Sequence, residues 1–313
     1  MAVPTNTFTT YDSVGEREDL ADVIYNVSPS ETPLLSMVER GKATAVYHEW
    51  QTDTLAAADT DNAVIEGEDA VTVAAVATAR VGNYCQISDK VASVTGTQQV
   101  VNKAGRGDEL DYQLIKMGKE LKIDMESIAF GMNQASNAGA AATARRSGSI
   151  LSWIATNDSH VGTSPTGNGT NTRTDGTQRA YTEALLKAAQ QLIWASGGNP
   201  DVIALGGFNK QVMSSFVGRG TPTEDAKSKK IVATVDFYEG DFGQQKVVAS
   251  RNIRTRDCLI LQKDMWEIAF LRNMKTYPLA KTGDSESKQI ISEWTLVSRN
   301  EKASGAVLDL TTS

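Results

Sequence analysis

Residues 108–137 read DELDYQLIKMGKELKIDMESIAFGMNQASN, and this stretch carries the strongest periodic signal in the chain. Its apolar side chains recur at spacings of three and four residues, at Leu110, Leu114, Met117, Leu121, Met125, Ile128 and Met132. Such spacing places them on one face of a helix. Asp108 can cap the N-terminus, and Asp111 adds negative charge to the first turn, where the helix dipole favours anions. The stretch therefore predicts a long amphipathic helix.

The chain before this helix is predicted to hold an extended arm and two short helices. Residues 1–15 are Thr-rich and polar and show no helical or strand period, which is typical of an arm. A short helix is expected over residues 16–26, ending before Pro29 because proline disfavours helix in the residue ahead of it. A second is expected within SETPLLSMVERG, residues 30–41, which Pro33 opens and Gly41 closes.

Two β-rich segments, residues 42–55 and 71–93, flank an acidic stretch. The first holds Tyr47 and Trp50 among alternating polar residues, a pattern that favours a strand. Residues 52–78 contain no Lys or Arg at all. Their acidic side chains are Asp53, Asp59, Asp61, Glu66, Glu68 and Asp69. Two strands joined by a long acidic insertion predict a protruding hairpin, which cannot bury a core by itself.

The C-terminal half is predicted to mix helices and strands. Residues 138–177 are rich in Ala, Gly, Ser, Thr and Asn and should form an unusually long loop. A helix over residues 182–196, a buried strand over 201–205 and a helix over 208–217 indicate an α/β unit. Further strands are expected around residues 231–238, 246–250, 258–262, 267–271, 290–299 and 307–310. The predicted fold class is α+β.

Composition excludes several classes of protein. The 313 residues are 40% hydrophobic and 22% charged, as in an ordinary globular protein. A net charge of -7 argues against a protein that grips nucleic acid, so any contact with DNA should be weak. Two cysteines and two histidines, all isolated in the sequence, predict no metal site and no cofactor. No signal peptide or membrane span is apparent, so the protein is expected in the cytoplasm of its host, without a membrane partner.

No candidate catalytic residue emerges from the motifs. Gly206 and Gly207 stand between a strand and a helix, but they lack the full phosphate-binding pattern and are better explained by a tight turn. Glu66 and Glu68 lie in a polar loop that offers no burial to raise a pKa. The arm, the hairpin and the long loop cost ordering entropy that a monomer cannot recover. They favour an assembly protein over an enzyme.

Three segments resemble a known family. They are SPSETPLLSMVERGKATAVYHEWQTDTL at residues 28–55, WEIAFLRNM at 266–274 and ISEWTLVSRNEKASGAVLDL at 291–310. Together with the order of elements they resemble the major capsid proteins of tailed bacteriophages, which share the Hong Kong phage capsid fold. The likeness is greatest for a subgroup formerly described only as a phage family of unknown function. It implies an icosahedral shell of hexamers and pentamers that encloses the genome.

The resemblance also implies a division of the chain and a set of partners. The expected parts are an N-terminal arm and lead-in (1–50), an extended loop (51–93), a peripheral domain with a spine helix and long loop (94–180), an axial domain (181–257) and return strands of the peripheral domain (258–313). Expected partners are other copies of the chain, a portal, separate scaffolding or decoration proteins and the packaged DNA. The short arm leads directly into the fold, so we expect neither a built-in scaffolding domain nor N-terminal trimming.

Two other functions stay open at this point. A bacterial nanocompartment shell protein, similar to encapsulins, would share the fold but enclose an enzyme. A carbohydrate-active enzyme or an adhesin would need a pocket with convergent side chains.

The charge pattern predicts how the extended loop would contact a neighbouring subunit. The acids Asp59, Asp61, Glu66, Glu68 and Asp69 are expected to dock on a basic patch of the adjacent copy. Its candidate residues are Arg251, Arg254, Arg256, Arg272 and Lys275. Some members of the family join a loop lysine to an asparagine of a neighbour, but no lysine occurs here between Lys42 and Lys90. The shell is therefore expected to be held without covalent bonds.

Overall fold

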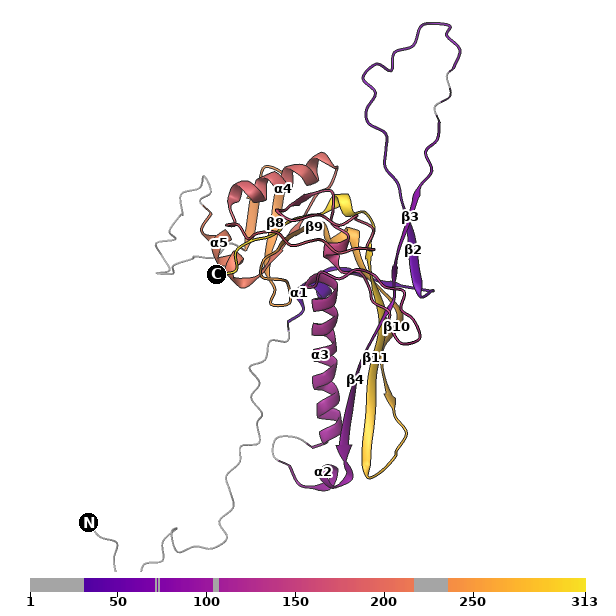
Figure 1. The fold of residues 1–313 in the computed structure, drawn as a ribbon, viewed down its shortest axis with the longest axis vertical. Helices are drawn as coiled ribbons and strands as arrows, with labels where there is room; N and C mark the ends of the chain where they lie inside the picture. Colours follow the sequence, from indigo (N-terminus) through magenta and orange to yellow (C-terminus); the bar gives the residue numbers. More distant parts are fainter. Residues whose placement is uncertain (1–30, 71, 73, 104–106, 217–235) are drawn as a thin grey trace, which may run out of the picture.

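The computed structural model describes residues 31–70, 72, 74–103, 107–216 and 236–313. The expected arm (1–15) and the expected helix over residues 16–26 lie outside these ranges. A long helix stands beside a tall, mainly antiparallel sheet, an α/β unit lies at one end of both, and a two-stranded hairpin projects beyond them (Figure 1). The expected α+β class is confirmed.

The long helix α3 spans Glu109–Phe130 and begins as its sequence predicts. The Asp108 carboxylate accepts a hydrogen bond from the Asp111 N–H at 3.1 Å, which caps the first turn. The prediction carried the helix to residue 137, but it ends at Gly131. A Cβ on Gly131 would lie 1.7 Å from the Asn252 carbonyl oxygen, so this glycine lets the backbone of another segment pass close to the helix end.

A four-stranded sheet lies against α3. Its order is β1 (Glu39–Lys42), β10 (Trp266–Pro278), β11 (Ser285–Ser298) and β4 (Gln86–Thr95), with β1 parallel to β10 and the other pairs antiparallel. Two short helices, α1 (Pro33–Met37) and α2 (Gly96–Val100), flank it. The helix α3 lies over β4 and β11, where Leu110 packs against Ala92 and Val94.

The segment from 38 to 42 corrects one prediction. Gly41 does not close a helix, because α1 ends at Met37 and Gly41 belongs to strand β1. A Cβ on Gly41 would lie 1.3 Å from a carboxylate oxygen of Glu267, which is in the paired strand β10. The glycine therefore leaves room for the Glu267 side chain across the backbone of β1.

A six-stranded sheet forms the α/β unit. Its order is β5 (Asp158–Ser159), β12 (Gly305–Val307), β9 (Cys258–Leu261), β6 (Val202–Leu205), β8 (Gly243–Ala249) and β7 (Phe237–Gly240). Helices α4 (Glu183–Ala195) and α5 (Gly207–Ser214) complete it, close to the predicted bounds. Part of the strand expected over residues 231–238 lies outside the described residues.

The strand pairing refines the expected division of the chain. The sequence predicts residues 258–313 as return strands of the peripheral domain, and β10 and β11 do lie in the four-stranded sheet. However, β9 and β12 pair within the six-stranded sheet, because each supplies a short, fully buried strand there. The C-terminal segment thus crosses between both sheets.

The long loop over residues 138–177 is irregular, as predicted, yet part of it belongs to the core. Its apolar island Ile150–Ser152 forms a short 3-10 turn, and Ile150, Trp153 and Ile154 are buried against α3 and the C-terminal strands. Two further 3-10 turns occur at Lys263–Met265 and Glu301–Ala303. A second core cluster fills the α/β unit between α4 and its sheet.

Both cysteines, Cys85 and Cys258, are buried. Burial raises the pKa of Cys85 to about 11 and the pKa of Cys258 to about 12. Neither thiol is therefore a ready nucleophile or a partner for a disulfide.

Candidate assembly surfaces

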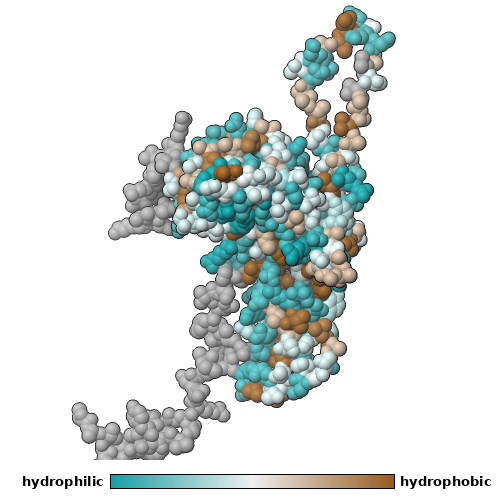
Figure 2. All heavy atoms as spheres, in the orientation of Figure 1, coloured by the Kyte–Doolittle hydropathy of each residue, from teal (hydrophilic) through white to brown (hydrophobic). Residues whose placement is uncertain are grey.

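The projecting hairpin is built from β2 (Tyr47–Thr52) and β3 (Ala79–Tyr84), which pair antiparallel from Tyr47 opposite Tyr84 to Thr52 opposite Ala79. Its loop, residues 53–78, extends far from the body of the subunit (Figure 1). Within the described part of this loop Leu55 is 99% exposed, Val76 85% and Val64 81%. Hydrophobic and hydrophilic residues alternate along it (Figure 2). A subunit alone leaves this apolar surface in water, which points to a partner.

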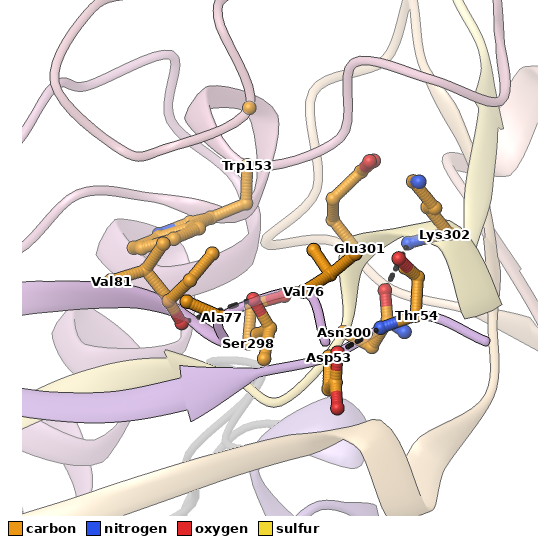
Figure 3. Close-up of a pocket in the computed structure, with 13 residues that line it drawn as sticks. Asp53, Thr54, Val76, Ala77, Val81, Trp153, Ser298, Asn300, Glu301 and Lys302 are labelled. Atoms are coloured by element: carbon orange, nitrogen blue, oxygen red, sulfur yellow. Dashed lines mark hydrogen bonds between the residues drawn. The ribbon is translucent and has the colours of Figure 1, made fainter. Parts of the chain in front are cut away.

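A crevice of about 250 Å³ separates the hairpin base from the body. Figure 3 shows Val81 of β3 beside Trp153, with Glu301 and Lys302 coming from the C-terminal segment on the other side. The Glu301 carboxylate accepts hydrogen bonds from the N–H groups of Ala155 and Thr156 and from the Thr156 hydroxyl.

The side chains at this crevice hold segments together. Trp153 also packs against Trp50 of β2, with ring centroids 5.3 Å apart and ring planes tilted by 39°. Asp53 accepts from the backbone N–H of Thr54 at 2.8 Å. The crevice therefore lies where the hairpin leaves the body of the subunit. Its acidic side chains, Asp53 and Glu301, accept hydrogen bonds from neighbouring loop residues.

The five predicted docking acids all lie in the exposed loop. Two of them make only local contacts: Asp59 accepts from the N–H of Asp61 at 2.9 Å, and Glu68 accepts from the N–H of Ile65 at 3.1 Å. Within the described ranges, none of the five forms an ion pair. Their charge is available to another molecule.

The predicted basic residues do not form one free patch. Arg254 lies 2.5 Å from Asp175, and Arg256 lies 2.8 Å from Asp309, both distances being nitrogen to carboxylate oxygen. Arg272 lies 2.8 Å from Glu293, in the neighbouring strand. Three of the five cations are therefore neutralised by acids of their own subunit.

Arg251 and Lys275 differ from the other three. Both are exposed, and neither pairs with a carboxylate among the residues that the structure describes. Arg251 follows β8, and Lys275 lies in β10. These two cations are the members of the predicted set that remain free for contact with a neighbour.

Asp309 is a buried acid with a structural role that the sequence prediction missed. It is fully buried and accepts hydrogen bonds from the N–H groups of Val161, Gly162 and Gly176 and from Arg173 and Arg256. Burial alone would raise the pKa of Asp309, but these donors outweigh it and hold the pKa well below its usual value. Asp309 thereby ties the long loop to the chain end.

Glu126 is a second buried acid that the pattern did not reveal. It stands on the inner face of α3, where its carboxylate accepts from the Leu35 N–H at 3.1 Å, the Ser250 hydroxyl at 3.0 Å and the Asn252 amide at 3.1 Å. Through these hydrogen bonds Glu126 links α1, α3 and the segment that follows β8. One available signal was an acid three and four residues before Ala129 and Phe130, which places it on the same helix face as these apolar side chains.

The described residues offer little for metal or membrane chemistry. They contain no group of three or more His, Cys, Asp or Glu side chains placed to hold a metal ion. None of the helices described is long and apolar enough to span a membrane.

Comparison with solved structures defines the class of protein. A capsid chain of Cyanophage A-1(L) superimposes with a TM-score of 0.64 at 13% identity, covering 97% of this chain and 99% of that one. A capsid chain of a native GTA particle gives 0.62 at 9% identity, covering 96% and 98%. A structure from Gordonia phage Cozz gives 0.61 at 11%, covering 95% and 92%. The fold is thus the Hong Kong phage capsid fold.

Sequence comparison then gives the family. The chain is 27% identical to the major capsid protein of Escherichia phage Phieco32, over 98% of this chain and 97% of that protein. Residues 3–311 match the SU10 major capsid protein family, and the chain belongs to it. It is a phage major capsid protein of the virion shell and not an enzyme. These findings give no support to a nanocompartment shell, a carbohydrate-active enzyme or an adhesin.

Proposed function

We propose that this capsid protein assembles in the host cytoplasm into the hexamers and pentamers of an icosahedral shell around the phage genome. The observation that carries the proposal is the loop over residues 53–78, in which Leu55, Val64 and Val76 are exposed and no described residue of the same subunit covers them. Capsid proteins of this family form shells with copies of themselves. A neighbouring subunit is the surface that would bury these side chains on every copy of the loop.

Electron microscopy of the purified protein tests this proposal. The expected result is closed particles of uniform diameter with five-fold and six-fold groupings of subunits. If the purified protein formed only open sheets or monomers at all concentrations, this would contradict assembly of the shell from this chain alone. Co-expression with the neighbouring phage genes would then show whether a separate scaffolding protein is required.

Further partners follow from the same proposal. A portal would occupy one vertex, and separate scaffolding or decoration proteins would act during or after assembly. Packaged DNA would make only weak, non-specific contacts, because a chain of net charge -7 lacks the cation surplus that tight phosphate binding requires.

The acidic loop is proposed to dock on an adjacent subunit through charge as well as apolar surface. Asp59, Asp61, Glu66, Glu68 and Asp69 have no ion-pair partner within the described residues. On the neighbour, Arg251 and Lys275 are the best candidates, since Arg254, Arg256 and Arg272 already face carboxylates of their own chain. Each exposed pair would contribute about 0 to 1 kcal/mol, and repetition around a ring multiplies this.

The assembled shell is proposed to be held without covalent bonds. The loop offers no lysine, and both thiols are buried. Boiled and reduced particles should therefore give a single band near 33.6 kDa on a denaturing gel. A ladder of multimers would reveal a crosslink and contradict this proposal.

A further inference from the structure

Two lysines of the long helix α3 are exposed on one side of it. Lys119 and Lys122 are three residues apart, so their side chains project from the same helix face, with Cβ atoms about 5–6 Å apart. Both are exposed, and neither forms an ion pair with a carboxylate of the described ranges. This part of the helix surface therefore carries two free positive charges.

The outer strand β1 adds two further cations on the side of the sheet that faces α3. Glu39 of β1 and Glu267 of β10 both pair with Arg299, which places these acids on one face of the sheet. Side chains alternate along a strand, so Arg40 and Lys42 lie on the other face, about 7 Å apart. Both are exposed, and neither has an ion-pair partner in the part of the chain that the structure describes.

A groove of about 440 Å³ brings the two pairs of cations together. Arg40 and Lys122 both belong to its lining, which includes no acidic side chain. We call the set of four the cationic surface; its members are Arg40, Lys42, Lys119 and Lys122. It concentrates unpaired positive charge on one side of a chain whose net charge is -7.

The acids of the same part of α3 do not neutralise this surface. Glu120 and Asp124 face β4, where the Lys90 ammonium lies 3.7 Å and 2.8 Å from their carboxylate oxygens. The Glu126 carboxylate is buried and accepts a hydrogen bond from the Leu35 N–H. The acids of the helix are thus engaged within the subunit, whereas Lys119 and Lys122 are not.

We propose that the cationic surface binds the phosphate backbone of the packaged duplex DNA. This inference rests on the proposed function, in which the shell encloses the genome, and it assigns the DNA contact to four residues. Duplex DNA carries one negative charge for about every 1.7 Å of its axis, so several phosphates lie within reach of cations spaced by about 5–7 Å. The contact does not depend on DNA sequence, because phosphates carry no sequence information.

The contact is weak for one subunit and becomes strong through repetition. Each copy neutralises at most about four phosphates, and the acidic remainder of the chain repels DNA. In a shell, every copy presents the same surface to one continuous duplex, which converts weak single contacts into avidity. The affinity of the monomer should therefore be low and should fall steeply with salt.

Binding of a duplex of about 30 base pairs to the full-length chain, kept below the concentration at which it assembles, tests the proposal. The variant with Arg40→Gln, Lys42→Gln, Lys119→Gln and Lys122→Gln should bind at least ten-fold more weakly in 50 mM NaCl. The slope of log affinity against log salt should become shallower by about 2 to 4. Fluorescence anisotropy measures both quantities, and circular dichroism checks the fold.

A second variant removes the same charge from exposed positions elsewhere. It carries Lys187→Gln, Lys246→Gln, Arg251→Gln and Lys281→Gln, and its affinity for the duplex should fall less than three-fold. Equal losses in the two variants would show that only net charge matters and would overturn the proposal.

Lysine acetylation of the unaltered chain gives a readout that needs no substitution. With the duplex bound, Lys42, Lys119 and Lys122 should be acetylated at least three-fold more slowly, as measured by mass spectrometry. Lys187 and Lys281 should keep their rates. Unchanged rates at the first three lysines would overturn the proposal.

Two comparisons identify what a failure would mean. Polyglutamate at equal charge concentration should protect the three lysines less than the duplex does, and equal or better protection would assign the surface to an acidic protein instead. Electron microscopy of the same preparation reports on assembly. A parent chain that forms shells but gives no protection by the duplex contradicts this inference alone, whereas absence of shells contradicts the proposed function.

Discussion

The body of the subunit and its projecting loop differ in two respects: whether charged groups are paired, and whether apolar side chains are buried. In the body, buried charge is neutralised locally: Asp309 receives five hydrogen bonds, and Arg254, Arg256 and Arg272 face carboxylates of the same chain. In the loop, the acids form no ion pairs among described residues, and Leu55 and Val64 are exposed. The charges of the body are thus matched largely within the subunit, whereas we propose that the loop is completed by another copy.

Removal of the loop should produce the largest effect. Replacing residues 53–78 by Asn-Gly joins Thr52 to Ala79, which are already paired, through a two-residue hairpin turn. The free energy of unfolding should change by no more than about 1 kcal/mol, because the loop makes few contacts with the body. Shells should be absent by electron microscopy.

A second variant controls for loop length. Leu55→Ser, Val64→Ser, Ile65→Ser and Val76→Ser keep the chain length and remove the apolar side chains. Assembly should again fail while the monomer stays folded. Normal shells from either variant would contradict the proposal that assembly requires the loop and its apolar side chains.

Asp309→Ala should cause the largest loss of stability in the body. It leaves Arg173 and Arg256 without their buried partner and three N–H groups unsatisfied, at a cost of about 3–5 kcal/mol. Urea unfolding of the loop-deleted monomer measures this. The exposed residue Asp264 provides the matched control, and Asp264→Ala should change stability by less than about 0.5 kcal/mol. Equal effects of the two variants would refute the anchoring role of Asp309.

Asp257 should give the subunit a measurable pH dependence. Burial raises the pKa of Asp257 to about 6, and the nearby Arg254 and Arg173 guanidinium groups offset only part of this shift. Because the folded-state pKa exceeds the unfolded value of about 3.9, the stabilising contribution is complete below pH 4 and is lost as the pH rises through about 6. The loss amounts to about 1–3 kcal/mol by pH 7.5.

The variant Asp257→Asn isolates this contribution. Its stability relative to the parent should increase between pH 5 and pH 7.5, when both are unfolded by urea in the loop-deleted background. Asp309 cannot cause the same trend, because its lowered pKa makes its contribution disappear only in strong acid. A stability difference that does not vary with pH would show that Asp257 is ionised throughout.

The free cations should have the smallest effect. Arg251→Ala with Lys275→Ala should change monomer stability by less than about 0.5 kcal/mol, because both side chains are exposed. The concentration needed for assembly should rise several-fold at low salt and return to normal in 0.5 M NaCl, since salt screens exposed pairs. Lys281→Ala, a change at another exposed lysine, is the control and should alter neither quantity.

Local patterns made the main elements predictable. The period of residues 108–137 and the cap at Asp108 were sufficient to locate α3, and the absence of cations in residues 52–78 identified the projecting loop. These features depend on residues close together in the sequence. The family resemblance supplied the arrangement of the parts.

Contacts between distant segments were not predictable in this way. The helix end at Gly131 depends on the Asn252 carbonyl, and the strand at Gly41 depends on Glu267 in β10. The candidate basic patch looked continuous because its arginines are neighbours in sequence. Their carboxylate partners Asp175 and Asp309 lie far away along the chain, so only the folded structure reveals that the charges are already neutralised.

Amide hydrogen exchange in the loop over residues 53–78 tests the central claim most directly. Mass spectrometry would compare the monomer with the assembled shell under identical buffer conditions, with peptides from α3 as an internal reference. The account predicts rapid exchange of the loop in the monomer and protection of at least ten-fold in the shell, while α3 is protected in both. A loop that exchanges as rapidly in the shell as in the monomer would contradict the claim that a neighbouring subunit completes it.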